Sequence, residues 1–149
     1  MSKKILSAEK IKVYCDGGAR NNPGPAAIGV VIEISKSEIK EYSEFLGSAT
    51  NNQAEYQAVI FALKKIKQLI GKEKSQALEV EIRSDSELLI KQLNGQFKIK
   101  DKDLQPLFFE IWNTKQDFKD VKFIQVPREE NKEADLLVNK ELNNREGMF

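Results

Sequence analysis

Histidine is missing from this chain, and cysteine occurs once, as Cys15. Sites in which a histidine activates a serine or cysteine nucleophile are therefore excluded, as is zinc held by histidine. A single cysteine also excludes an internal disulfide and a cysteine-based zinc site. Hydrolytic chemistry in this sequence must depend on carboxylates, on lysine, or on a hard cation such as Mg²⁺ or Mn²⁺ with oxygen ligands.

Long apolar runs are also missing. None approaches the roughly 20 residues that span a bilayer, and no apolar segment follows the first lysines as in a secretory signal, so we expect a cytoplasmic protein. The net charge is only +1, which restricts any nucleic-acid-binding surface to a local patch. The 149 residues suit one domain, and we expect residues 1–10 and 144–149 to be flexible ends.

The first third of the chain predicts three strands. Apolar and polar residues alternate over Ile11–Cys15, and Ala27–Ile34 and Ile39–Leu46 read as further strands. The turn-forming residues of Asp16–Pro25 predict a loop between the first two. Short connections favour antiparallel pairing of all three strands.

Helices and strands alternate in the rest of the chain. Thr50 and Gln53 match a capping box at the start of a long helix, which Gly71 is suited to end. The later predicted elements are a strand over 78–83, a short helix ended by Gly95, a helix over 104–117, a strand over 121–126 and a helix over 132–143. This pattern predicts one α/β domain with a mixed sheet.

Four carboxylates occupy positions that favour a functional interpretation. Asp16 ends the first predicted strand and Asp85 directly follows the fourth. The two would meet at one edge if those strands were neighbours, which is an assumption. Glu55 lies on the apolar stripe of its helix, and Asp135 has the same relation to Val138 in the last helix. An inward carboxylate is costly unless it is paired or binds a metal ion.

Each acid has an ordinary explanation as well. Asp16 fits turn chemistry, Glu55 a favourable acid in the first turn of a helix, Asp85 a helix cap, and Asp135 a solvated surface acid. A joint site would explain all four. Clustered carboxylates repel one another, and two divalent ions about 3.5–4 Å apart would neutralise them and assist phosphodiester hydrolysis.

Four segments around these acids add a more specific signal. They read Tyr14-Cys-Asp-Gly-Gly-Ala-Arg-Asn-Asn-Pro-Gly-Pro25, Ala49-Thr-Asn-Asn-Gln-Ala-Glu-Tyr56, Ser84-Asp-Ser-Glu87 and Glu130-Asn-Lys-Glu-Ala-Asp135. In this order they resemble the motifs of type 1 ribonuclease H, over about Ile11 to Leu142. The resemblance implies an RNase H-like fold, with a five-stranded mixed sheet flanked by helices. It also implies an endonuclease that hydrolyses the RNA strand of RNA–DNA hybrids and leaves 5′-phosphate and 3′-hydroxyl ends.

The resemblance further implies roles for particular residues. The metal-binding catalytic set would be Asp16, Glu55, Asp85 and Asp135, with two Mg²⁺ or Mn²⁺ ions. The substrate-binding set would be Gly18, Ala19, Asn21, Asn22, Asn51, Asn52 and Gln53. Main-chain groups of a Gly/Asn-rich loop and amide side chains can reach 2′-hydroxyls or minor-groove base edges, which suits this assignment. The alternative is that the first segment is only a hairpin connection.

Three departures from the family pattern bear on activity. The loop histidine that many relatives carry before the last acid is absent, and Arg128 or Glu129 are auxiliary candidates in its place, unless both are solvated loop charges. The basic insertion of some relatives is reduced to Gln96–Asp103, either an apolar-backed basic strip that follows phosphates or an ordinary connection. Glu87 stands where relatives often have an RNA-contacting amide, and a carboxylate cannot donate a hydrogen bond.

Three other interpretations remain open at this stage. The chain could be a binding module that has lost catalysis, although all four acids are present. It could cut double-stranded RNA, which shares the A-form shape of the hybrid. A purely structural protein would leave the inward Glu55 unexplained. We expect a monomer.

Overall fold

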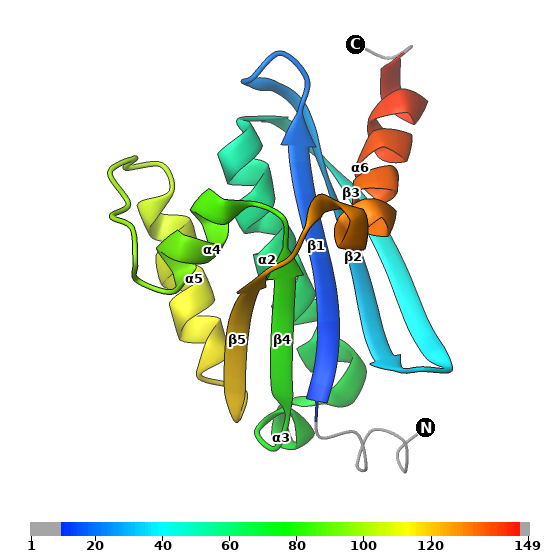
Figure 1. Ribbon diagram of the computed structural model, residues 1–149, viewed down its shortest axis with the longest axis vertical. Coiled ribbons are helices and arrows are strands. Elements are labelled where there is room, and N and C mark those ends of the chain that lie inside the picture. The colour runs from blue at the N-terminus through cyan, green and yellow to red at the C-terminus, as the bar shows by residue number, and fades with distance from the viewer. Residues whose placement is uncertain (1–9, 147–149) are drawn as a thin grey trace.

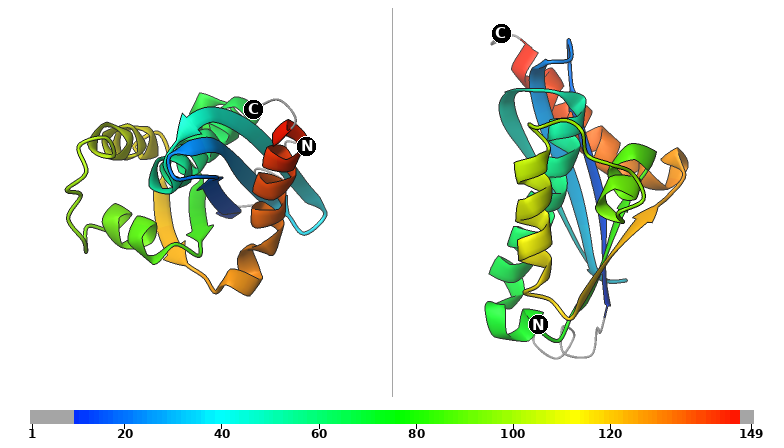
Figure 2. Two further views of the ribbon diagram at one scale, coloured as in Figure 1. Left: turned by 90° about the horizontal axis from the view of Figure 1, so that it is seen from above. Right: turned by 90° about the vertical axis from the view of Figure 1, so that its left-hand side faces the viewer.

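The computed structural model describes residues 10–146, which form a five-stranded sheet with helices on both faces (Figures 1 and 2). The strands are β1 Lys10–Ala19, β2 Gly24–Ser35, β3 Glu38–Ala49, β4 Glu79–Ser84 and β5 Asp120–Gln125. Their order in the sheet is β3-β2-β1-β4-β5. The first three strands are antiparallel, whereas β4 runs parallel to both β1 and β5. The predicted mixed sheet is confirmed, and β1 and β4 are neighbours.

Five α-helices and one 3₁₀ helix follow β3 in the described part of the chain. They are α2 Asn51–Ile70, α3 Lys72–Ser75, α4 Glu87–Leu93, α5 Gln105–Lys115, the 3₁₀ helix η1 Arg128–Asn131 and α6 Lys132–Arg145. The predicted capping box of α2 is present: Thr50 Oγ1 accepts from Gln53 N at 3.1 Å, and Gln53 Oε1 accepts from Thr50 N at 2.9 Å. Gly71 ends this helix with a positive φ of 98°, a backbone conformation that favours glycine.

The main core lies between the sheet and α2. Ile11, Val13 and Cys15 alternate along β1 toward this helix and are buried. Helix α5 packs on the outer side of α2, and α6 covers the opposite face of β1, β2 and β3 (Figure 2). A smaller cluster of Ala27, Val138 and Leu142 lies under α6. Strand β2 is therefore buried on both faces.

The predicted loop Asp16–Pro25 is wrong for most of its length. Strand β1 continues to Ala19 and β2 already begins at Gly24, so Asp16 pairs with Gly29 inside the ladder. The turn-forming residues are accommodated because the neighbouring strand satisfies their main-chain groups, which local composition cannot show. Only residues 20–23 connect the two strands.

Other predicted boundaries shift by a few residues. Lys10 begins β1, and residues 144 and 145 belong to α6. These positions therefore lie in regular secondary structure and not in the flexible ends that the sequence predicts. The rest of the predicted flexible ends, residues 1–9 and 147–149, lie outside the described residues. Trp112 is 49% exposed, whereas Ile111 fills the inner side of α5. Within residues 10–146 no helix has the length and apolar character needed to cross a membrane.

Candidate active site

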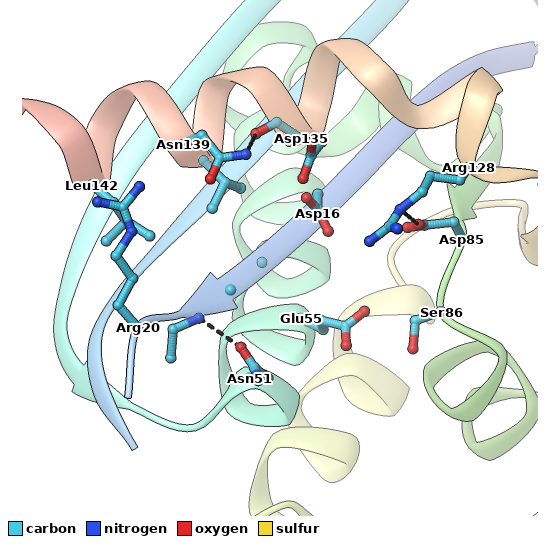
Figure 3. A pocket seen from close by; sticks show the side chains of 14 residues that line it. Asp16, Arg20, Asn51, Glu55, Asp85, Ser86, Arg128, Asp135, Asn139 and Leu142 are labelled. Atoms are coloured by element: carbon cyan, nitrogen blue, oxygen red, sulfur yellow. Dashed lines mark hydrogen bonds and ion pairs between the residues drawn. The ribbon is translucent and has the colours of Figure 1, made fainter. Parts of the chain in front are cut away.

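The four singled-out carboxylates line one cavity of about 440 Å³ (Figure 3). Asp16 comes from β1, Glu55 from the second turn of α2, Asp85 from the residue after β4, and Asp135 from the first turn of α6. The parallel β1–β4 ladder ends with the pair Tyr14 and Arg83, which brings Asp16 and Asp85 to the same edge. The structure thus brings together acids that are far apart in sequence, since Asp16 and Asp135 are separated by 119 positions.

Two glycines allow the elements of the site to approach one another. A Cβ atom on Gly17 would overlap the main chain of Ala54 and Glu55, so α2 contacts β1 at the residue after Asp16. A Cβ atom on Gly29 would overlap the carbonyl of Ala134 in the same way. Only glycine permits this close contact of backbones. The approach of α2 and α6 to the sheet places Glu55 and Asp135 beside Asp16.

Burial and mutual repulsion dominate the electrostatics of the cavity. Burial, followed by the charge of Asp85 and a hydrogen bond with Asp135, raises the pKa of Asp16 to about 8. Burial also raises the pKa of Glu55 to about 7, although a hydrogen bond from Ser86 acts in the opposite direction. Near neutral pH, Asp16 is therefore mostly protonated and Glu55 partly protonated unless cations enter the site.

Asp85 has the most donors around it. Asn131 Nδ2 donates to Asp85 Oδ1 at 3.1 Å, and Arg128 Nε lies 3.8 Å from Asp85 Oδ2. The Arg128 side chain is 86% exposed, so its ion pair with Asp85 is solvated. Asp85 is not the helix cap suggested as an alternative, because Ser86 occupies that position and its hydroxyl accepts from Leu89 N.

The two auxiliary candidates, Arg128 and Glu129, lie in different cavities. Arg128 lines the carboxylate cavity, whereas Glu129 lines a separate cavity of about 310 Å³ with Tyr14 and Val31. Glu87 does not line the carboxylate cavity, and it forms an ion pair with Lys91 on the next turn of α4. Of these charged residues, only Arg128 is placed to act on the acids.

The predicted substrate-binding residues form a linked unit of which only part faces the cavity. Asn51 Oδ1 accepts from Ala19 N at 2.7 Å, and Asn22 Oδ1 accepts from Asn51 N at 2.9 Å, so the β1–β2 hairpin is tied to the start of α2. Gly18, Ala19 and Asn51 line the cavity. The others do not line it: Asn21 and Asn22 are in the hairpin turn, Asn52 lines a small depression beside Glu55, and Gln53 is used in the capping box.

Sequence reasoning missed four polar residues of the site. Ser86, Arg20 and Asn139 line the cavity, and Asn131 donates to Asp85. Arg20 is held by Glu146 and Asn143 at the other end of α6. Ser86 and Asn131 stand inside the segments already quoted. Ser86 directly follows Asp85, and Asn131 lies four residues before Asp135, so closeness to these acids in sequence could have indicated both residues. Arg20 also stands inside the first quoted segment, whereas nothing in the sequence marks Asn139.

The predicted basic strip Gln96–Asp103 has no regular secondary structure. Ile99 packs against the core, whereas Phe97 is 42% exposed with Lys91 above its ring. The predicted apolar backing is therefore provided by Ile99 alone. Lys98 and Lys100 are exposed, which leaves them available to phosphates.

The donor set of the cavity fits a hard divalent cation. Its candidate ligands are carboxylate oxygens, and the raised pKa values of Asp16 and Glu55 show that positive charge is in short supply there. Among residues 10–146, no three acidic or thiol side chains converge closely enough to form a finished metal site. The acids are grouped around the cavity rather than around one point.

Comparisons with known proteins agree with this architecture. A protein-family profile described as "Reverse transcriptase-like" matches residues 14–141. Ribonuclease HI of Halobacterium salinarum is 37% identical over 135 residues, or 90% of this chain. The chain belongs to the ribonuclease H family. The halobacterial relative is itself named as a ribonuclease.

Solved structures extend the similarity to three dimensions. The crystal structure of RNase H1 from Halobacterium salinarum superimposes with a TM-score of 0.82 and covers 91% of this chain and 98% of that one. LC11-RNase H1, isolated from compost, is 43% identical with a TM-score of 0.84, covering 91% and 97%. The same protein in complex with an RNA/DNA hybrid gives a TM-score of 0.81, covering 87% and 94%.

The curated relatives are longer than the matched segment. The match spans 65% of the halobacterial ribonuclease HI. It spans only 35% of a Mycobacterium tuberculosis relative named as a bifunctional protein, which is 34% identical over 132 residues. This ribonuclease H family chain therefore corresponds to part of those proteins.

Proposed function

We propose that the protein is an endoribonuclease that hydrolyses the RNA strand of RNA–DNA hybrids, leaving 5′-phosphate and 3′-hydroxyl ends. The observation that carries the proposal is the convergence of Asp16, Glu55, Asp85 and Asp135 on one open cavity. The 43% identical LC11-RNase H1 has been crystallised with an RNA/DNA hybrid, which supports the choice of substrate.

The four carboxylates would hold two divalent cations, Mg²⁺ or Mn²⁺, which supply the positive charge that favours water as a nucleophile and stabilises the departing oxygen. Without such charge, burial raises the pKa of Asp16 to about 8 and the pKa of Glu55 to about 7, which leaves both carboxyl groups at least partly protonated near neutral pH. Ser86 donates to the Glu55 carboxylate and so favours its ionised form. The side-chain amide of Asn131 donates a hydrogen bond to Asp85 Oδ1, which restrains that carboxylate. The chain's own contribution is thus to present ionisable oxygens from four rigid elements.

The RNA strand would lie along the edge formed by the β1–β2 hairpin and the start of α2. Asn51 already accepts from Ala19 N, so its Nδ2 group remains free to donate to a 2′-hydroxyl or base edge. Gly18 and Ala19 expose main chain along the same cavity. A 2′-hydroxyl contact at this edge is what would distinguish RNA from DNA.

Arg128 would act on charge rather than on protons. A guanidinium stays protonated at all accessible pH values, so Arg128 cannot replace a histidine as proton acceptor. Its exposed side chain near Asp85 can instead contact a phosphate oxygen at the mouth of the cavity. We therefore assign Arg128 an auxiliary electrostatic role, and none to Glu129.

The deciding experiment uses an RNA–DNA hybrid labelled on each strand, incubated with Mg²⁺, Mn²⁺ or EDTA. We expect metal-dependent loss of the RNA strand alone, and loss of activity by at least about 1,000-fold in Asp85→Asn, which removes a ligand charge at nearly constant shape. The matched control is Asp120→Asn, an exposed acid at the start of β5 outside the cavity. Intact hybrid under every metal would favour the binding-module alternative.

Double-stranded RNA is the second substrate to test, because it shares the A-form shape and the 2′-hydroxyls of the RNA strand. Glu87, which stands where relatives often carry a donor, pairs with Lys91 and leaves this discrimination to the hairpin and α2. Cleavage of the RNA duplex in the same assay would extend the proposed activity. The cytoplasmic location and monomeric state stay predictions.

A further inference from the structure

Asn131 is one of the most deeply buried polar residues of the described chain, at 2% exposure. It occupies the N-cap position of α6, where an asparagine side chain ordinarily accepts a hydrogen bond from the first turn of the helix. Here the side chain makes no capping bond. Its amide instead points toward the carboxylate cavity.

Both protons of the Asn131 amide are used on the site. Nδ2 donates to the carbonyl of Cys15 at 2.9 Å and to Asp85 Oδ1 at 3.1 Å. The opposite amide orientation would place an oxygen against two acceptors, so this assignment follows from the chemistry of the neighbours. Asn131 Oδ1 is buried without a partner. Asn131 thus makes these two donated hydrogen bonds, while its side chain does not cap α6 and its Oδ1 atom accepts no hydrogen bond.

The two acceptors belong to different strands of the site. Cys15 directly precedes Asp16 on β1, just beyond the last β1–β4 pair, Tyr14 and Arg83. Asp85 directly follows β4. One amide therefore links Cys15, within β1, to the residue that follows β4, beside the point where the β1–β4 ladder stops. Asn131 does so from a position four residues before Asp135.

We propose that Asn131 is a positioning residue for the carboxylate site, holding Asp85 and Cys15 of β1 in register with α6 so that the acids bind divalent cations. The inference rests on the proposed function for its cation site. Asn131 does not line the cavity, so it acts through Asp85 and not on the substrate. Removing a residue that hydrogen-bonds to a metal ligand typically lowers the metal affinity 10- to 100-fold.

The test compares Asn131→Ala with Asn94→Ala by calorimetric titration with Mn²⁺ and by melting in EDTA. Asn94 is a matched control, because its Nδ2 also donates across the fold, to the Phe123 carbonyl at 3.0 Å, but away from the cavity. We expect the half-saturating Mn²⁺ concentration to rise about 10-fold or more in Asn131→Ala and to stay within about twofold of wild type in Asn94→Ala. The KM for hybrid should change less than the metal requirement.

Equal Mn²⁺ affinity in wild type and Asn131→Ala, with both alanine variants melting lower, would show that Asn131 is merely structural and overturn the inference. If Asn131→Ala does not fold, Asn131→Leu keeps a similar side-chain volume without any donor, and an unchanged Mn²⁺ affinity in that variant overturns the inference equally. Saturable Mn²⁺ binding without hybrid cleavage would refute the proposed nuclease but not the role of Asn131. A wild-type protein without saturable Mn²⁺ binding would refute the role itself.

Discussion

At the scale of single residues, the site is defined by carboxyl groups whose ionisation opposes folding. Burial, followed by the charge of Asp85, raises the pKa of Asp16 to about 8, against an ordinary value near 4. A raised carboxyl pKa costs nothing below the unfolded value, where both states hold the proton. The cost grows as pH rises from about 4 to about 8, because the unfolded chain ionises while the folded one does not. Glu55 adds a similar cost up to about pH 7.

The first prediction is that Asp16→Asn stabilises the metal-free protein at alkaline pH. Replacing the acid removes the cost of ionising it, so we expect the free energy of unfolding at pH 8.5 to rise by about 1–2 kcal/mol, and to change little at pH 4. Urea denaturation in EDTA at the two pH values measures both terms. A variant that is less stable than wild type at pH 8.5 would contradict the repulsion on which the site is built.

At the scale of elements, close backbone contact decides whether the acids meet. Gly17 lies against the α2 backbone at Ala54 and Glu55, and an added methyl group has no room there. We predict that Gly17→Ala pushes α2 from β1, lowers the free energy of unfolding by about 1–3 kcal/mol, and abolishes hybrid cleavage. Gly18→Ala is the control for stability, because its Cβ would make only ordinary contacts, such as 3.6 Å to Val138 Cγ1. Equal melting temperatures for both variants would refute this account.

Sequence patterns predicted the elements well where periodicity is strong. The capping box of α2 and the order of helices and strands are confirmed. The hairpin was misread because Asp16–Ala19 are turn formers by composition and become strand only through pairing with β2. Asn131 was missed for a related reason: an asparagine before a helix predicts a cap, and its diversion to Asp85 depends on a strand far away in sequence. Long-range contacts decide both cases.

At the scale of the whole molecule, a cation bound in the cavity would join four elements drawn from the whole length of the described chain. Strand β1, helix α2, the end of β4 and helix α6 each contribute one acid and separate on unfolding. A ligand that binds only the assembled site stabilises the fold by RT ln(1 + [L]/Kd), where [L] is the free ligand concentration. Metal binding and global stability should therefore be coupled in this protein.

That coupling must depend on pH, because the cation competes with protons for the same oxygens. The pKa is raised to about 8 for Asp16 and to about 7 for Glu55. Cation binding at pH 6 must therefore displace protons from these carboxyl groups, whereas at pH 9 the groups are already ionised. We predict that the half-saturating Mn²⁺ concentration falls by about 10-fold or more between pH 6 and pH 8.5, and that saturating Mn²⁺ raises the melting temperature more at the higher pH. Calorimetric titration and thermal melting measure the two effects. Metal affinity independent of pH over this range would mean that the cation does not bind to these two carboxyl groups, and the site would have to be drawn around Asp85 and Asp135 alone.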